Sequence, residues 1–145
     1  MSQDEPAHGE SVIEQAIKAA NSAFYRAFRE RDFASMERIW ASEVPVACIH
    51  PGMAPLIGRD AVMASWRGIL GHPGAPTLHS SAVRVHLLGT SALLTCLEGE
   101  ENGLPKLVAT NVFTMENGHW RLSHHHGAAL LSPPEKQKPR DRTLN

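Results

Sequence analysis

Apolar residues recur every three or four positions through the first third of the chain, a spacing that is typical of amphipathic helices. The first such stretch begins at Ser11-Val-Ile-Glu14, a capping box whose Ser and Glu side chains satisfy free N–H groups of the first turn. Its apolar positions are Ile13, Ala16, Ile17, Ala20, Phe24, Ala27 and Phe28. The pattern therefore predicts a helix that runs from Ser11 to the charged sequence RERD at 29–32.

Two shorter helices and one strand are predicted before residue 77. Asp32 can cap a short helix whose buried side carries Phe33, Met36, Ile39 and Trp40. The segment GRDAVMASWRGIL at 58–70 predicts a third helix, with its inward positions at Val62, Trp66, Ile69 and Leu70. Between these helices, VPVACIHPG at 44–52 is rich in β-formers and predicts a strand that Pro51-Gly52 ends.

The chain after Pro76 is strand-like. Four segments, at 78–89, 91–100, 104–115 and 119–130, are separated by Gly-Thr-Ser and by two Asn-Gly pairs, which favour tight hairpins because both residues tolerate a positive φ. Three helices with one early strand, followed by a four-stranded meander, predict a single α+β domain. Its helices pack in a strongly curved, mainly antiparallel sheet.

The Asn-Gly turns also predict the register of the hairpins. With Asn117-Gly118 as a two-residue loop, pairing runs outward along the two strands as Glu116–His119, Met115–Trp120, Phe113–Leu122, Asn111–His124 and Ala109–His126. The same argument at Asn102-Gly103 gives Glu98–Leu107, Cys96–Ala109 and Leu94–Asn111. In this register Asn111, His124 and His126 point inward toward the helices, and His125 points outward.

Composition and charge narrow the functional classes. The chain has 145 residues, enough for one domain, and its net charge of -1 offers no electrostatic footprint for nucleic acid or an anionic membrane. The acidic N-terminus lacks the basic start and apolar run of a signal peptide, and Cys48 and Cys96 lie in predicted strands as buried thiols, so a cytoplasmic protein is expected. We expect a disordered arm at 1–10, the domain at 11–131 and a disordered tail at 132–145.

Several motifs together resemble the SnoaL-like branch of the nuclear transport factor 2-like superfamily. They are FYRAFRERDFASMERIWA at 24–41, His50-Pro51 at the end of the early strand, IGRDAVMASW at 57–66 and VFTMENGHWRLSHHHGA at 112–128. The resemblance covers about residues 11–131. It implies a cystatin-like cone, in which a bent sheet wraps around the helices and a pocket opens at one end. Homodimers through the outer sheet face are common in this family.

The resemblance also implies a chemistry, because the family includes steroid Δ-isomerases and polyketide cyclases. In the isomerases an aspartate before a proline is the general base, and His50 resembles that position. Histidine suits proton transfer at neutral pH. The rest of the isomerase apparatus is missing: the phenol donor aligns with Phe24, Tyr25 is one step away on another helix face, and the strands from 78 to 131 hold no aspartate. Asn111 or His124 are the candidate substitutes.

Three interpretations of the histidines at 50, 124 and 126 remain open. In the first, they are buried groups that are hydrogen-bonded to each other, to Asn111 or to a backbone carbonyl. In the second, they form a pocket with His50 as base and His124 or His126 orienting a substrate. In the third, they bind Zn²⁺ or Fe²⁺, with Glu98 completing the shell. Glu98 is either a pocket acid or an ordinary strand-end carboxylate. The expected ligand contacts are Asn111, Trp40, Trp66, Trp120 and Phe28, although core packing also explains the tryptophans at 40 and 66.

The sequence thus predicts a SnoaL-like pocket protein for a small apolar or amphiphilic molecule. One hypothesis is an isomerase, cyclase or hydratase that works by His-mediated proton transfer, without a metal or other cofactor; the alternative is a non-catalytic binding or dimerisation module. A homodimer is expected through the outer sheet face, where Val108, Val112 and Leu97 lie among threonines and Arg121 or His125 lies near the contact.

Overall fold

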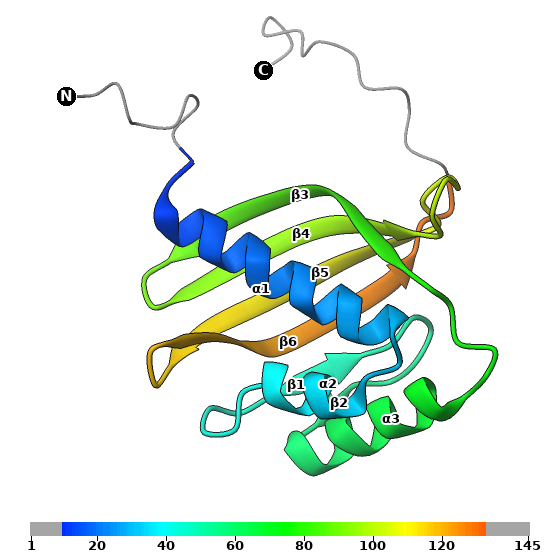
Figure 1. Cartoon of the computed structure of the whole chain (residues 1–145), viewed down its shortest axis with the longest axis horizontal. Helices are drawn as coiled ribbons and strands as arrows, with labels where there is room; N and C mark the ends of the chain where they lie inside the picture. Colours follow the sequence, from blue (N-terminus) through cyan, green and yellow to red (C-terminus); the bar gives the residue numbers. More distant parts are fainter. Residues whose placement is uncertain (1–9, 133–145) are drawn as a thin grey trace, which may run out of the picture.

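The fold is that of a computed structural model, which describes residues 10–132 and has an α+β arrangement (Figure 1). Its helices are α1 (Val12–Arg29), α2 (Phe33–Ile39) and α3 (Arg59–Gly71). Its strands are β1 (Ala47–Ile49), β2 (Leu56–Ile57), β3 (His79–Leu88), β4 (Ser91–Gly99), β5 (Leu107–Glu116) and β6 (His119–Ala129). Residues 1–9 and 133–145, most of the predicted arm and tail, lie outside the described residues. No helix within 10–132 has the length and apolar character that crossing a bilayer requires.

The six strands form one sheet in the order β2-β1-β6-β5-β4-β3. The predicted antiparallel meander is confirmed as β3 to β6. The early strand, β1, pairs in parallel with β6 and so extends this meander at its β6 edge. The short β2, which the sequence did not predict, pairs antiparallel with β1. The parallel pairing brings the residues just before Pro51 beside the histidines of β6.

Helix α1 crosses the concave face of the sheet, and α2 and α3 lie beside β1 and β2 (Figure 1). The predicted capping box is confirmed, with the Glu14 amide 3.1 Å from Oγ of Ser11. From Ile17 onward one face of α1 is buried against the sheet, as its spacing predicts, whereas Ile13 and Ala16 in the first turns are exposed. The core includes Ile17, Phe24, Phe28, Met36, Trp40, Val62, Trp66, Leu94, Phe113 and Leu122.

Two charged side chains, Arg59 and Glu116, are hydrogen-bonded to the backbone of the connection from α2 to β1. Arg59, at the start of α3, donates to the carbonyl oxygens of Trp40 (3.0 Å) and Ala41 (2.8 Å). The carboxylate of Glu116 accepts from the backbone amides of residues 42, 43 and 44 at 3.0, 2.8 and 3.2 Å. Burial works against this carboxylate, but the backbone donors outweigh it and lower the pKa of Glu116.

The two Asn-Gly turns differ in geometry while both set the predicted register. Asn117 and Gly118 have φ values of 52° and 79°, the two positive values of a type I′ turn, and Glu116 pairs with His119. In the other turn only Asn102 adopts a positive φ, of 63°, so the loop is not of that type. Its strands still pair as predicted, from Glu98–Leu107 to Leu94–Asn111.

A β-bulge in β6 overturns the predicted facing of the three histidines. Phe113 pairs with Leu122, but Val112 pairs with His124, so Ser123 is an extra residue. The Ser123 hydroxyl donates to the Val112 carbonyl oxygen at 3.2 Å and lies 3.0 Å from Oγ1 of Thr114.

Beyond the bulge the side chains change faces. Asn111 pairs with His125 and not with His124, and Ala109 pairs with Gly127 and not with His126, so both predicted pairings are wrong. His125 is buried with 2% of its surface exposed, whereas His124 is half-buried and His126 is exposed on the outer face. Alternation along a strand without a bulge predicts the opposite, with His124 and His126 inside and His125 outside.

Candidate functional site

Five polar side chains are buried together between α1 and the inner face of the sheet. We call them the inner polar row: Asn21, Tyr25, Glu98, Asn111 and His125, none more than 2% exposed. The two from α1 are four residues apart, so they lie on one side of the helix, and the other three point inward from β4, β5 and β6. Burial of so many polar groups is costly unless they bond to each other.

Hydrogen bonds connect the whole inner polar row. Nδ2 of Asn111 donates to Oδ1 of Asn21 at 2.9 Å and to the Tyr25 hydroxyl at 3.3 Å. The Tyr25 hydroxyl donates to Oε2 of Glu98 at 2.5 Å. Nδ1 of His125 lies 2.5 Å from Oδ1 of Asn111. The row therefore runs without a break from the β4 carboxyl group to the β6 imidazole.

The network assigns the tautomer of His125. Because the Asn111 amide nitrogen is the donor toward α1, its oxygen is the acceptor, and Nδ1 of His125 must carry the proton. Nε2 of the neutral ring then holds a lone pair. Within residues 10–132 no hydrogen-bond partner occupies that lone pair.

A second imidazole, His50, lies where β1 ends. It is 7% exposed, and its Nε2 lies 3.0 Å from Oγ of Ser65 on α3. That hydroxyl donates to the carbonyl oxygen of Val62 at 2.7 Å, so it accepts from the imidazole, and Nε2 of His50 carries the proton. The other nitrogen, Nδ1, is left as the basic position; the Cys48 sulfur lies 4.0 Å from it and 3.7 Å from Nε2.

The Trp66 ring joins the two imidazoles into one site. Its centroid is 5.1 Å from that of His50 and 6.0 Å from that of His125. Trp66 is fully buried, and its indole N–H has no acceptor within the described part of the chain. An unpaired buried donor beside two imidazoles is unusual, because such groups are normally hydrogen-bonded. We call these three residues the His50–His125 site.

Burial keeps the His50–His125 site neutral. It lowers the pKa of His50, and it lowers the pKa of His125 to about 3, helped by the neighbouring imidazoles of residues 50, 124 and 126. Burial also raises the pKa of Glu98, although the hydrogen bond from Tyr25 opposes this. Burial, with the nearby Glu98 carboxylate second, raises the pKa of Tyr25. At neutral pH the site thus presents two unprotonated ring nitrogens.

Gly127 lets the backbone approach the site closely. A side-chain carbon added at this position would lie 3.3 Å from Cγ of Pro51 and 3.6 Å from Nε2 of His125. The first distance is tight for the rigid proline ring. A side chain at this position would therefore press on Pro51 and come into ordinary contact with the free nitrogen of His125.

The structure separates the residues of the predicted metal set. His124 and His126 lie on the outer face, with ring centroids 6.3 Å apart, whereas His50 and Glu98 lie inside. No group of three or more His, Cys, Asp or Glu side chains within residues 10–132 is placed to hold a metal ion. The two strand histidines therefore cannot share an ion with Glu98.

The remaining predicted site residues have mixed positions. Asn111 is in the inner polar row, Trp66 is in the His50–His125 site, and Phe28 packs on Trp66 at 5.1 Å. Trp40 lies in the core near α2, and Trp120 is half-buried. Phe24 and Tyr25 are both buried, although they are neighbours on α1.

From the sequence, Asn21 and Tyr25 were not predicted as site residues, and for Glu98 two alternatives were left open. The i, i+4 spacing of Asn21 and Tyr25 was the available indication, because it places both polar groups on one face of α1. For Glu98, the predicted pairing with Leu107 placed it near the inner face, but its closeness to the turn favoured a solvent-exposed carboxylate.

Comparison with known proteins places the chain among relatives of one fold. Residues 17–132 match the sequence profile of the SnoaL-like domain. A proposed dehydratase of the NTF2-like family from Streptomyces avermitilis is 30% identical, with a TM-score of 0.71 over 81% of this chain and 96% of that one. A proposed calcium/calmodulin-dependent protein kinase type II association domain from Thiobacillus denitrificans is 37% identical, with a TM-score of 0.68 over 78% and 94%.

A curated relative is longer than this chain. The F-box protein SKIP8 of Arabidopsis thaliana is 30% identical over 118 residues, which are 81% of this chain and 51% of that protein. The chain thus spans about half the length of the curated relative it matches.

Proposed function

Because the chain belongs to the SnoaL-like domain family, we propose that it binds a small carbonyl-bearing molecule at the His50–His125 site and moves a proton on it. The observation that carries this proposal is the pair of buried, neutral imidazoles, each with one ring nitrogen that is hydrogen-bonded to no N or O atom of residues 10–132. A neutral imidazole is a competent base near pH 7.

His50 is the proposed base. It is the more exposed of the two imidazoles, and the hydrogen bond from its Nε2 to Ser65 fixes the ring so that Nδ1 takes the proton. Removal of a proton next to a carbonyl group is the common first step of isomerisation, cyclisation and dehydration. The name of the Streptomyces relative, a proposed dehydratase, agrees with this class of chemistry.

Two other groups have proposed roles toward the ligand. The free N–H of Trp66 is a donor suited to the oxygen on which negative charge develops. Asn111 holds the His125 ring through Nδ1, and the free Nε2 is an acceptor suited to a hydroxyl group of the ligand. The inner polar row behind it fixes the tautomer, so His125 positions the ligand and His50 moves the proton.

The test is exchange of hydrogen for deuterium next to the carbonyl of simple ketones in heavy water, followed by proton NMR. His50→Gln should slow exchange by about 10²-fold or more, the usual scale for a general base. His86→Gln alters an exposed histidine on β3 and is the matched control. No exchange above buffer by the wild type, over a panel of cyclic and acyclic ketones, would contradict the proposal, as would equal rates in the wild type and His50→Gln.

A second candidate function, self-association, rests on a different surface. The outer sheet face carries half-buried Leu97, Val108, Thr110 and Val112, and none of the three helices within residues 10–132 lies over them. The Thiobacillus relative is named as a proposed association domain. We propose a homodimer in which two copies of this face pack together.

A further inference from the structure

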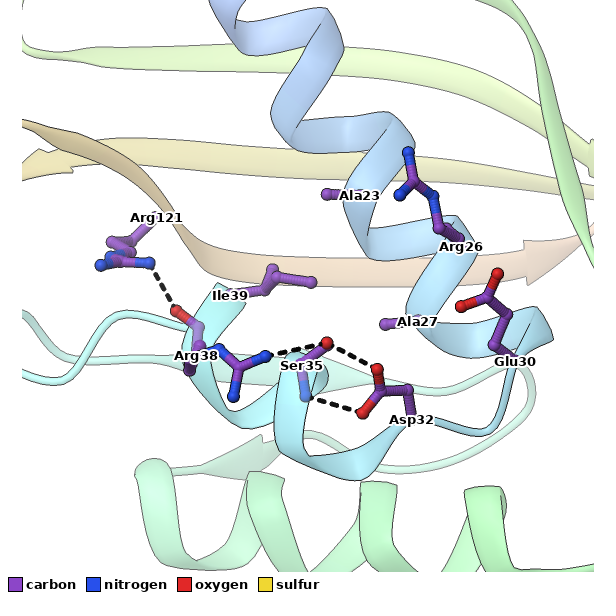
Figure 2. Close-up of a pocket in the computed structure, with 9 residues that line it drawn as sticks. All are labelled: Ala23, Arg26, Ala27, Glu30, Asp32, Ser35, Arg38, Ile39 and Arg121. Carbon is purple, nitrogen blue, oxygen red and sulfur yellow. Dashed lines mark hydrogen bonds between the residues drawn. The ribbon is translucent and has the colours of Figure 1, made fainter.

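A groove lies between α1 and α2, away from the His50–His125 site, with a volume of about 360 Å³ (Figure 2). Its apolar part is made by Ala23 and Ala27 of α1 and Ile39 of α2, which point toward one another across it. None of the lining residues belongs to the inner polar row or to the His50–His125 site. The volume is within the range of small-molecule sites.

Arginines border the groove without carboxylate partners. Nη1 of Arg121 donates to the carbonyl oxygen of Arg38 at 2.7 Å, and Nη2 of Arg38 donates to Oγ of Ser35 at 3.1 Å. Each guanidinium has five N–H groups, so most of these donors are free of protein acceptors. Arg26 adds a third positive charge, and none of the three forms an ion pair within residues 10–132.

A second hollow, of about 250 Å³, adjoins the first, since Arg38 and Arg121 line both. Trp40 borders this second hollow, and its indole N–H is buried without an acceptor within the described residues. Glu116 also lines it, but the carboxylate already accepts from three backbone amides. The second hollow thus adds one residue with an unpaired buried donor, Trp40, beside the two arginines.

The end of the groove away from Arg121 carries two carboxylates, Asp32 and Glu30, and one guanidinium, that of Arg26 one helical turn before Glu30, so this end is net negative (Figure 2). Asp32 caps α2 and accepts from the Ser35 hydroxyl at 2.7 Å and from the Ser35 amide at 3.0 Å. These hydrogen bonds lower the pKa of Asp32, so it is ionised at neutral pH. A ligand with a second negative charge at this end would be repelled.

We infer that this groove binds a small monocarboxylate with a short apolar body. The carboxylate meets the guanidinium groups of Arg38 and Arg121, which suit its planar geometry, and the apolar body lies on Ala23, Ala27 and Ile39. This is a site distinct from the carbonyl site, and the inference does not depend on the proposed catalysis.

The experiment is a titration of the ¹⁵N-labelled full chain with sodium benzoate at constant ionic strength, followed through amide shifts. The wild type should show saturable shifts centred on the residues of the groove. Arg38→Gln and Arg121→Gln should each weaken binding by about tenfold or more, as expected for loss of a hydrogen bond to a charged group. Arg84→Gln, which alters an exposed arginine on β3, and His50→Gln should bind as the wild type does.

Two ligand controls define the outcome. Terephthalate, with a carboxylate at each end of the same ring, should bind at least tenfold more weakly than benzoate, because its second charge meets Glu30 and Asp32. Inorganic phosphate should not displace benzoate at equal concentration. Shifts that do not saturate, equal affinities in the wild type and Arg38→Gln, or displacement by phosphate would each overturn the inference. Arg38 is exposed and lies on a surface turn of α2, so its variant tests the site even if Arg121→Gln does not fold.

Discussion

The imidazole of His125 and the carboxamide of Asn111 face each other across the β5–β6 pair, with Nδ1 2.5 Å from Oδ1. Both side chains are buried, and each fixes the other. The amide oxygen selects the tautomer of the ring, and the ring N–H satisfies the amide oxygen. Through Asn111 the imidazole is connected to Tyr25 on α1. The helix and the sheet are therefore held at this point by directional bonds as well as by apolar contact.

Removal of the Tyr25 hydroxyl should destabilise the domain. In Tyr25→Phe, Glu98 loses its donor and the Asn111 amide loses one of its acceptors, both in the interior. We expect the free energy of unfolding to fall by about 1–3 kcal/mol, the cost of unsatisfied buried polar groups. Urea unfolding measures it. Ser91→Ala, which alters a half-buried hydroxyl on β4, should change the free energy by less than about 0.5 kcal/mol. A similar small change for Tyr25→Phe would contradict the network.

The buried imidazole should make the stability depend on pH. Burial lowers the pKa of His125 from 6.5 to about 3, so between these values the folded state binds fewer protons than the unfolded state. Its contribution to stability is present above pH 6.5 and is lost as the pH falls, with a slope of up to about 1.4 kcal/mol per pH unit. His125→Gln should flatten the profile in this window, and His86→Gln should leave it unchanged. Parallel profiles for all three proteins would argue that His125 is accessible to protons in the folded state.

Glu116 should make the stability of the domain depend on pH in the way expected of a carboxylate. The backbone amides of residues 42–44 lower its pKa in the folded state below 4.5, so its contribution is present above pH 4.5 and is lost as the pH falls through the folded value. Glu116→Gln should lose about 1–2 kcal/mol at neutral pH. The difference from the wild type should narrow below pH 4.5. Glu37→Gln, on the exposed side of α2, is the control, and a pH-independent difference would be the adverse result.

The outer sheet face should control the oligomeric state. Sedimentation of the wild type at micromolar concentration should give twice the 15.8 kDa mass of the chain. Val112→Lys places a charge in the middle of the proposed contact and should give the monomer mass. Ile57→Lys, at a residue that is 72% exposed on β2, should remain dimeric. A monomeric wild type would remove the dimer proposal and leave the His50–His125 site unaffected.

Short-range patterns in the sequence were enough for the α+β fold class and most of the register. The capping box at Ser11, the helical spacing of α1 and the Asn117-Gly118 turn act over a few residues, so their physics can be read locally. The place of β1 could not be read in this way. Its parallel pairing with β6 joins residues 77 positions apart along the chain, and a three-residue strand carries no pattern that indicates this pairing.

The inner histidine was missed for a related reason. A serine in mid-strand gives no indication of a bulge, and the hydrogen bonds that support Ser123, to Val112 and Thr114, form only when the strands have paired. A single uncounted residue reverses the two faces of a strand. The error changed the identity of the inner imidazole but not its partner, since Asn111 was placed on the inner face in either case.

Three histidines in a row allow more than one register of β6 to place an imidazole opposite Asn111. With the bulge at Ser123, the ring of His125 reaches Asn111; with a regular ladder, the ring of His124 would occupy the same position. A one-residue change of register would thus keep an imidazole beside Asn111, although it would also move Gly127 away from Pro51. The repeated residue gives the strand a redundancy that a single histidine would lack.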